Sequence, residues 1–269
     1  MQAEAGLQHM VALRRQEARR LAFFDAGIWL GPPAGFPLAK ELLPEQIGRA
    51  LDERLITGGL VSHWRSKTIS AQDGNLALEA AMPKLPEQTC VVWTGLPLDL
   101  AEPGPLPGQG PLPDRVRGVR IFPKSHHFPL ADWVVGSLCR WLVEHRLPLW
   151  MWHVELDWPS LYTLARQWPE LLIVVETQTQ KILYHTRPLL ALMRQCPNVH
   201  VEISNFVGVH AVEYVVGQLG AERLIFGSFQ PASDPLVPMG MVLDADISEN
   251  DKTLIAGGNL RRLIDEVQP

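Results

Sequence analysis

Short β-rich runs alternate with helical patterns from one end of the chain to the other, and no other feature limits the fold as strongly. The eight runs lie at residues 21–29, 59–63, 89–94, 117–122, 147–153, 171–176, 198–204 and 223–228. Strands that are each followed by a helix form a parallel sheet covered by helices. Eight such units within about 250 residues predict a (β/α)₈ TIM barrel, and an open doubly wound sheet of similar size is the alternative.

Helical patterns fill the segments between the runs. They lie at residues 44–55, 74–81, 131–145, 158–167, 187–196, 209–219 and 248–266, and the first twenty residues predict a further helix ahead of the first strand. Pro44 suits a first helical turn, and Ser248 is a favourable N-cap. Residues 102–113 contain five prolines and three glycines, which predicts a long extended loop. Because the strand and helix rhythm continues on both sides of it, we expect one domain over residues 1–269.

Charge and composition exclude several functional classes. The chain has 24 Lys and Arg against 29 Asp and Glu, a net charge of −5, so it has no basic excess for nucleic acid. Its apolar runs are far shorter than the roughly 20 residues that cross a membrane. The N-terminal region lacks a secretory signal pattern, so we expect a cytoplasmic protein. The three cysteines are far apart, which predicts neither a disulfide framework nor a thiolate metal site. The expected partner is a small molecule, and a homodimer stays open.

Several segments together resemble the amidohydrolase-related family, which includes aminocarboxymuconate-semialdehyde decarboxylase and sugar lactonases. Residues 222–231 read ERLIFGSFQP and are similar to that family's eighth-strand signature, R-hydrophobic-hydrophobic-F-G-S-D-aromatic-P. Residues 24–31, FDAGIWLG, resemble its first-strand motif D-x-H-x-H-x-G. Residues 169–177 and 198–204 resemble its sixth and seventh strands, and residues 247–263 its closing helix. The resemblance implies a barrel of the metal-dependent-hydrolase type, with its site at the carboxyl ends of the strands.

The metal-binding residues that the resemblance implies are replaced in this chain. The two histidines of the first-strand motif, which would share one strand face toward a divalent metal, correspond to Gly27 and Trp29. The other ligand positions correspond to Trp152, Thr177 and Phe229, and a shift of one residue would put His153 at the first of these. Such side chains cannot replace histidine or carboxylate ligands. We therefore expect no family metal and no cofactor.

Polar residues nevertheless follow several of the predicted strands. Alternation along residues 198–204 turns Glu202 inward, which makes it a candidate general base with a pKa raised by a dry barrel. His153 is the second candidate catalytic residue. The candidate substrate-binding residues are Trp29, His63, Arg65, Lys124, His126, Glu155 and Asn205. Glu176 is the alternative candidate for the general base. In the other interpretation, Glu202 pairs with an arginine such as Arg65 or Arg120 and only fills the barrel, while Glu176 faces outward.

Two hypotheses about function follow. The first is a divergent hydrolase or lactonase that acts without a metal on small organic substrates, including carboxylated substrates. The second is a catalytically inactive barrel that binds small molecules or interacts with other proteins. Fold resemblance alone cannot separate them. A metal site of another kind around His126, His127 or His153 also stays open, although two adjacent residues cannot share one strand face.

Overall fold

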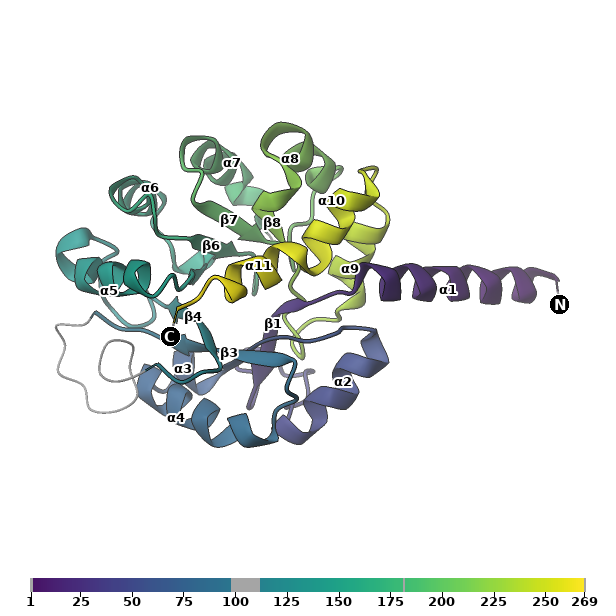
Figure 1. Cartoon of the computed structure of the whole chain (residues 1–269), viewed down its shortest axis with the longest axis horizontal. Coiled ribbons are helices and arrows are strands. Elements are labelled where there is room, and N and C mark those ends of the chain that lie inside the picture. Colours follow the sequence, from purple (N-terminus) through teal and green to yellow (C-terminus); the bar gives the residue numbers. More distant parts are fainter. Residues whose placement is uncertain (1, 98–111, 181, 269) are drawn as a thin grey trace.

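The computed structural model describes residues 2–97, 112–180 and 182–268, and its centre is an eight-stranded parallel sheet in the order β1 to β8 (Figure 1). Backbone hydrogen bonds from Trp29 N to Gln230 O (2.9 Å) and from Ala26 N to Phe226 O (3.1 Å) join β1 to the segment after β8 and close the sheet. The predicted barrel is confirmed, and the open sheet is excluded. The strands are β1 (Asp25–Leu30), β2 (Gly59–His63), β3 (Thr89–Thr94), β4 (Val116–Ile121), β5 (Leu149–Trp152), β6 (Ile173–Glu176), β7 (Val199–Glu202) and β8 (Leu224–Ile225).

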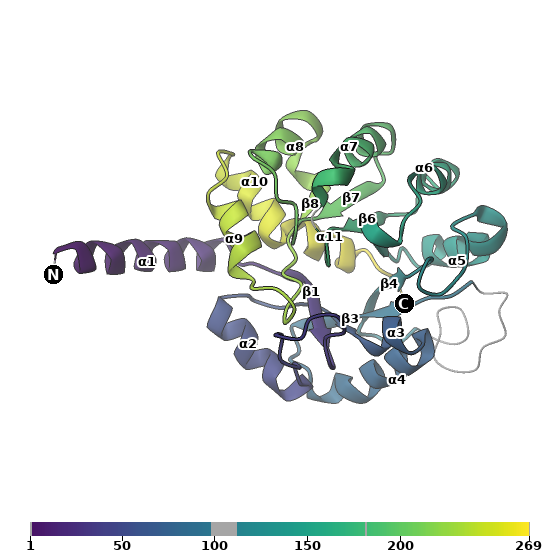
Figure 2. The same cartoon turned by 180° about the vertical axis from the view of Figure 1, so that it is seen from behind.

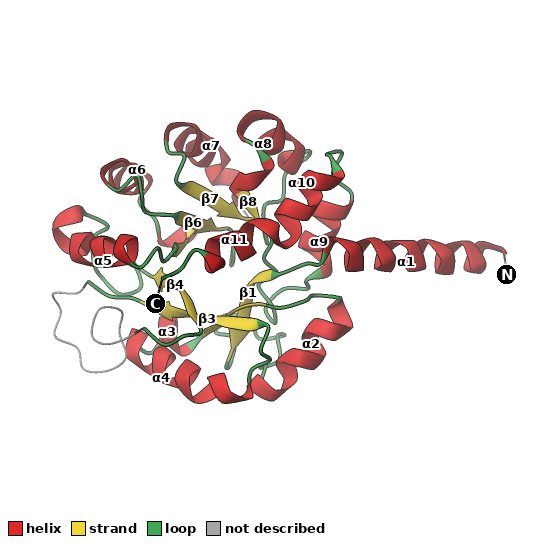
Figure 3. Cartoon of the chain, in the orientation of Figure 1, coloured by secondary structure: helices red, strands yellow, loops and turns green. Residues whose placement is uncertain are grey.

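Helices surround the strands (Figure 3). Two of them, α3 and α9, were not predicted, because α3 is a single turn and α9 contains Pro238 and Gly240. Pro238 lies in the first turn of α9, where a missing N–H costs no helical hydrogen bond. The helices are α1 (Gln2–Leu21), α2 (Ile47–Arg54), α3 (Arg65–Thr68), α4 (Ala71–Ala81), α5 (Asp132–Glu144), α6 (Trp158–Gln167), α7 (Thr186–Gln195), α8 (Ala211–Leu219), α9 (Leu236–Leu243), α10 (Glu249–Thr253) and α11 (Asn259–Asp265).

Alternation along the strands separates the barrel interior from the layer of helices. Met151, Val175 and Val201 belong to the main core between strands and helices. Trp150 and Val174, each one residue earlier, instead pack inside the barrel with Leu260 of α11. Helix α11 lies across the end of the barrel that faces the reader in Figure 1. The amino end of the barrel is therefore closed, which leaves the carboxyl end as the place for a site.

The helix predicted at residues 248–266 is interrupted by a π-helical turn, Leu254–Gly258. Its wider hydrogen-bonding spacing frees two carbonyl groups. The Ile255 carbonyl accepts from Phe226 N (3.0 Å), and the Ala256 carbonyl accepts from Phe24 N (2.9 Å). A Cβ on Gly257 would come within 3.0 Å of Phe24 Cβ, so glycine permits this close approach. The turn thus fixes the last helix to the chain beside β1 and β8.

The remaining sequence expectations concern the ends and one loop. Helix α1 forms as predicted and projects away from the barrel in both views (Figures 1 and 2). Most of the loop predicted at 102–113 lies outside the described residues, which include only Leu112 and Pro113 of it. Among the helices described, none combines the length and apolar character needed to cross a membrane.

Candidate functional site at the barrel mouth

Aromatic side chains fill the carboxyl end of the barrel. We call Trp29, Trp64, Phe122, Trp152 and Phe229 the aromatic plug; none is more than 2% exposed. The Trp29 ring centroid lies 5.0 Å from that of Trp64 and 5.2 Å from that of Trp152, and Trp152 lies 5.8 Å from Phe229. Five strands contribute, because each plug residue ends or follows a different strand. Trp29, a predicted substrate-binding residue, is thus enclosed by other rings.

A buried ion pair lies against the plug. The Arg120 guanidinium donates to both carboxylate oxygens of Glu176, with Nε–Oε2 at 2.8 Å and Nη2–Oε1 at 2.6 Å, and it also donates to Ser62 Oγ. Its Cζ lies 4.5 Å from the Trp29 ring centroid. Gln178 links the ion pair to the aromatic plug, since its Nε2 donates to Glu176 Oε1 (2.7 Å) and its Oε1 accepts from Trp29 Nε1 (2.8 Å).

This ion pair corrects two expectations. Glu176 faces into the barrel and is fully buried, so the outward orientation of one of the two interpretations is wrong. Arg120 does pair with an inward carboxylate, but with Glu176 and not with Glu202. A bidentate, fully desolvated pair of this kind is a fixed structural element, because separating the charges would leave one of them buried alone.

Glu202, the candidate general base, lies beside Glu176 in register on the neighbouring strand and is fully buried. Its carboxyl group accepts from Ser204 N (2.7 Å) and from Thr177 N (3.1 Å). Burial, followed by the nearby Glu176 carboxylate, raises the pKa of Glu202 to about 8. The group therefore holds its proton at neutral pH, when a general base must be free of one.

The raised pKa of Glu202 predicts that this residue's contribution to the free energy of unfolding falls as pH rises. The unfolded chain releases the Glu202 proton near pH 4.5 and the folded chain only near pH 8. Between these values the unfolded state gains from ionisation and the folded state does not, so the free energy of unfolding decreases by roughly 1 kcal/mol per pH unit. Asp25, whose pKa burial also raises, contributes in the same direction. The difference in the free energy of unfolding between the wild type and Glu202→Gln isolates the contribution of Glu202, because buried histidines with a lowered pKa, such as His63, act in the opposite direction below about pH 6.5. Urea unfolding of both proteins between pH 5.5 and pH 8 should show this difference falling by roughly 1 kcal/mol per pH unit; a difference that does not change with pH would contradict the assignment.

Asp25 connects the two ends of the barrel sheet. Its buried carboxylate accepts from Gly27 N and Ser228 N, both at 2.8 Å, from Gln230 Nε2 at 2.8 Å, and from Ser228 Oγ. Asp25 and Ser228 belong to the motifs that resemble the family's first and eighth strands, but no role was predicted for either residue. The motif match was the available signal, since the two residues lie 203 positions apart.

A salt-bridge cluster occupies the rim on the β4 and β5 side. Glu155 accepts from Lys67 Nζ (2.7 Å), from Ser125 N (2.9 Å) and from Ser125 Oγ (2.7 Å). Burial alone would raise the Glu155 pKa, but these hydrogen bonds outweigh it and the pKa is lowered. Lys124 is exposed and donates to Val154 O (2.8 Å). Glu155 and Lys124 were predicted site residues; Lys67 and Ser125 were missed.

His153, the second catalytic candidate, is buried beside His185. Its Nε2 lies 2.8 Å from the Gln180 carbonyl, so this nitrogen carries the proton and donates. Its Nδ1 lies 3.0 Å from Nδ1 of His185 and must accept from it. Burial lowers the pKa of His153, consistent with this neutral form. The lone pair that a general base would use is therefore engaged within the protein.

The other predicted residues are distributed around the rim. His63 is half-buried, accepts from Arg65 N (3.1 Å), and has a pKa that burial lowers to about 4, while the Arg65 side chain is exposed. His126 is half-buried against Phe122, with ring centroids 5.5 Å apart. The Asn205 backbone donates to Thr177 Oγ1 (2.8 Å), close to Glu202. The predicted residues thus do not share one hydrogen-bond network: His63 bonds to Arg65, Glu155 to Lys67, and His153 to His185.

Comparisons with solved structures address the fold. No family model matches the chain, and no curated protein does. An amidohydrolase from Burkholderia multivorans with bound zinc is similar over 90% of this chain and 99% of its own, with 16% identity and a TM-score of 0.68. Amidohydrolase 2 from Bifidobacterium longum subsp. infantis is similar over 90% of this chain and 98% of its own, with 15% identity and a TM-score of 0.64. For 5-carboxyvanillate decarboxylase from Sphingomonas paucimobilis, the similarity covers 91% of this chain and 99% of its own, with 15% identity and a TM-score of 0.59. The fold is that of the amidohydrolase barrels.

The side chains at the mouth of this barrel do not fit a divalent metal. A Cβ on Gly27 would lie 2.8 Å from Phe229 N, so no ligand side chain fits there. Trp29, Trp152 and Phe229, at three further ligand positions of the resemblance, pack in the aromatic plug. Within residues 2–97, 112–180 and 182–268, no three His, Cys, Asp or Glu side chains are grouped to hold a metal ion. The donor set that zinc or manganese requires is not assembled there.

Proposed function

We propose that this chain is a catalytically inactive amidohydrolase barrel that serves as a binding or interaction protein. The observation that carries the proposal is the aromatic plug, whose five rings bury one another at the carboxyl ends of the strands. Enzymes of this fold bind substrate at that end of the barrel, between the strand ends. A substrate would have to displace rings that are already packed at van der Waals contact.

The protonation states of the two candidate catalytic residues support the same proposal. Glu202 retains its proton at neutral pH and is fully buried. His153 accepts from His185 and donates to the Gln180 carbonyl. Neither side chain is free to take a proton from a substrate or a water molecule, which is the step that metal-independent hydrolysis would require.

One observation favours the alternative of a metal-independent hydrolase or lactonase. A carboxyl group with a pKa of about 8 can donate a proton at neutral pH, as a general acid does when a leaving group departs. This reaction would need the plug to open and admit a lactone or ester to Glu202. Phe36, which packs on Phe229 at a centroid distance of 5.3 Å and is only half-buried, lies where such an opening would begin.

Turnover and metal content decide between the two. The purified protein, prepared without added metal, should convert no member of a panel of lactones, esters and aromatic carboxylates faster than buffer does. Added zinc or manganese should leave Tm unchanged, because the described part of the chain groups no three His, Cys, Asp or Glu side chains that could bind either ion. Wild-type turnover that disappears in Glu202→Gln or His153→Ala would overturn the proposal in favour of the hydrolase, and stoichiometric bound metal would overturn it in favour of metal-dependent chemistry. The cytoplasmic location and the homodimer stay predictions.

A further inference from the structure

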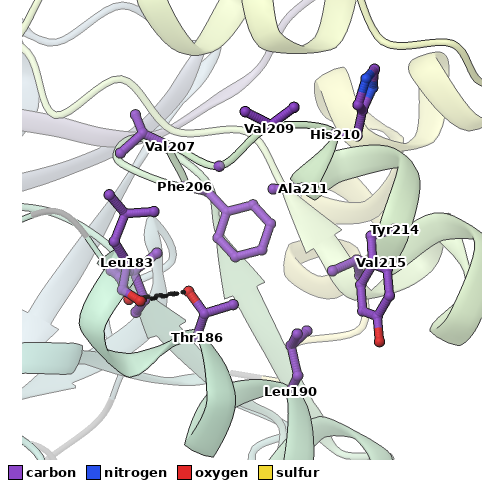
Figure 4. A pocket seen from close by; sticks show the side chains of 12 residues that line it. Leu183, Thr186, Leu190, Phe206, Val207, Val209, His210, Ala211, Tyr214 and Val215 are labelled. Carbon is purple, nitrogen blue, oxygen red and sulfur yellow. Dashed lines mark hydrogen bonds between the residues drawn. The ribbon is translucent and has the colours of Figure 1, made fainter.

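An apolar pocket lies between α7 and α8, lined partly by the segments that follow β6 and β7 (Figure 4). The Phe206 ring, from the segment between β7 and α8, projects into it, with Leu183 and Leu190 on the α7 side and Val215 on the α8 side. Val209 stands at its lip. The pocket volume is about 280 Å³.

The polar groups in the lining are already engaged by the protein. Thr186 Oγ1 donates to the carbonyls of Ile182 (3.3 Å) and Leu183 (3.2 Å). Tyr214 Oη accepts from Arg194 Nη2 at 2.8 Å, and His210 Nδ1 lies 3.4 Å from the carboxylate of Glu213. A charged ligand would therefore lose its hydration without gaining an ion-pair partner in the pocket. The lining is suited to an uncharged, apolar molecule.

The size of the pocket sets the size of its ligand. A dry apolar cavity of about 150 Å³ holds benzene. The pocket between α7 and α8 has roughly twice that volume, although it falls just short of the range of about 300–1,000 Å³ typical of drug-sized ligands. It therefore matches a two-ring aromatic molecule or a medium-length hydrocarbon chain.

The entrance exposes apolar side chains that a ligand would cover. Val209 is 94% exposed and Leu183 is 50% exposed, although both line the pocket. His210, directly after Val209, has a φ of 51° and turns the chain sharply into α8. This turn holds Val209 out at the lip. Clustered apolar exposure beside a pocket is characteristic of ligand-binding sites.

We propose that the pocket between α7 and α8 binds a small, uncharged apolar molecule. Phe206, Leu190 and Val215 form its interior, and Val209 and Leu183 close over the ligand at the entrance. The proposal does not depend on whether the barrel mouth is catalytic, because the pocket shares no residue with the aromatic plug.

Titration with N-phenyl-1-naphthylamine, an uncharged two-ring fluorophore, tests the proposal. The wild-type protein should bind it saturably with one site per chain. Val209→Asp puts a charge at the lip, and Ala211→Phe puts a ring into the pocket beside Phe206. Each should weaken binding by roughly tenfold or more while Tm stays close to the wild-type value. Ile69→Asp is the matched control, since Ile69 is 65% exposed directly after α3 and does not line the pocket; it should bind as the wild type does.

Competition by 1-alkanols gives a second measurement on the same site. Each added methylene should tighten binding about fourfold until the chain fills the pocket, after which affinity should stop rising. The proposal fails if the wild type shows no saturable binding, or if Val209→Asp and Ala211→Phe bind the fluorophore as tightly as Ile69→Asp does. Enzymatic turnover at the barrel mouth would refute the proposed function and leave this result unaffected.

Discussion

Replacing Arg120 by methionine should lower the free energy of unfolding by about 3–5 kcal/mol. The variant keeps the bulk of the side chain but leaves the Glu176 carboxylate fully buried without its cation. Glu176 must then take up a proton or be partly hydrated, and either change disturbs its hydrogen bond from Gln178. The guanidinium contact with the Trp29 ring is lost as well.

Urea unfolding monitored by circular dichroism measures the loss of stability in Arg120→Met. Two further variants are compared with it. Arg49→Met removes an exposed arginine from its pair with Glu53 and should cause no measurable change, because surface pairs contribute little. The double variant Arg120→Met/Glu176→Leu removes both buried charges and should recover most of the lost stability, since an apolar pair can replace a buried ion pair. If Arg120→Met were as stable as Arg49→Met, the buried pair would have no structural role.

The pairing of Arg120 shows where sequence reasoning succeeded and where it could not. Alternation correctly turned Glu202 inward, because residues 198–204 mix polar and apolar side chains with a period of two. It could not orient Glu176, because the strand Ile173–Glu176 is IVVE and parallel strands are apolar on both faces. Two carboxylates point inward, and Arg120 on β4 pairs with Glu176 on β6 and not with Glu202 on β7, one strand further along the sheet.

The strand and helix pattern was predictable, because every unit repeats the same local signals. Gln178 and Asp25 were not, since their roles depend on partners far away in sequence: Gln178 accepts from Trp29, and Asp25 accepts from Ser228. The aromatic plug was visible in part. Trp29, Trp152 and Phe229 stood at positions that the family resemblance places at the mouth, but only the fold shows that Trp64 and Phe122 lie there too.

Replacing Trp29 by alanine should be equally damaging, with a loss of about 3–5 kcal/mol. The substitution removes a fully buried ring that contacts Trp64, Trp152 and Phe229. It also leaves Gln178 Oε1 without its indole donor in a buried site. Thermal and urea unfolding measure the loss. Trp133→Ala is the matched control, because Trp133 is 80% exposed on α5 and its removal should change stability by no more than about 0.5 kcal/mol.

Indole added to Trp29→Ala tests whether the stability loss comes from an empty space within the plug. A cavity of the shape of the lost side chain should bind indole, so indole should raise Tm of Trp29→Ala in a concentration-dependent way and by more than it raises wild-type Tm through the pocket between α7 and α8. The bound indole N–H can also restore a donor to Gln178. If Trp29→Ala were as stable as Trp133→Ala, and if indole raised its Tm no more than it raises that of the wild type, the rings would not be packed as a unit. The mouth would then be able to open, and the proposal of an inactive barrel would fail.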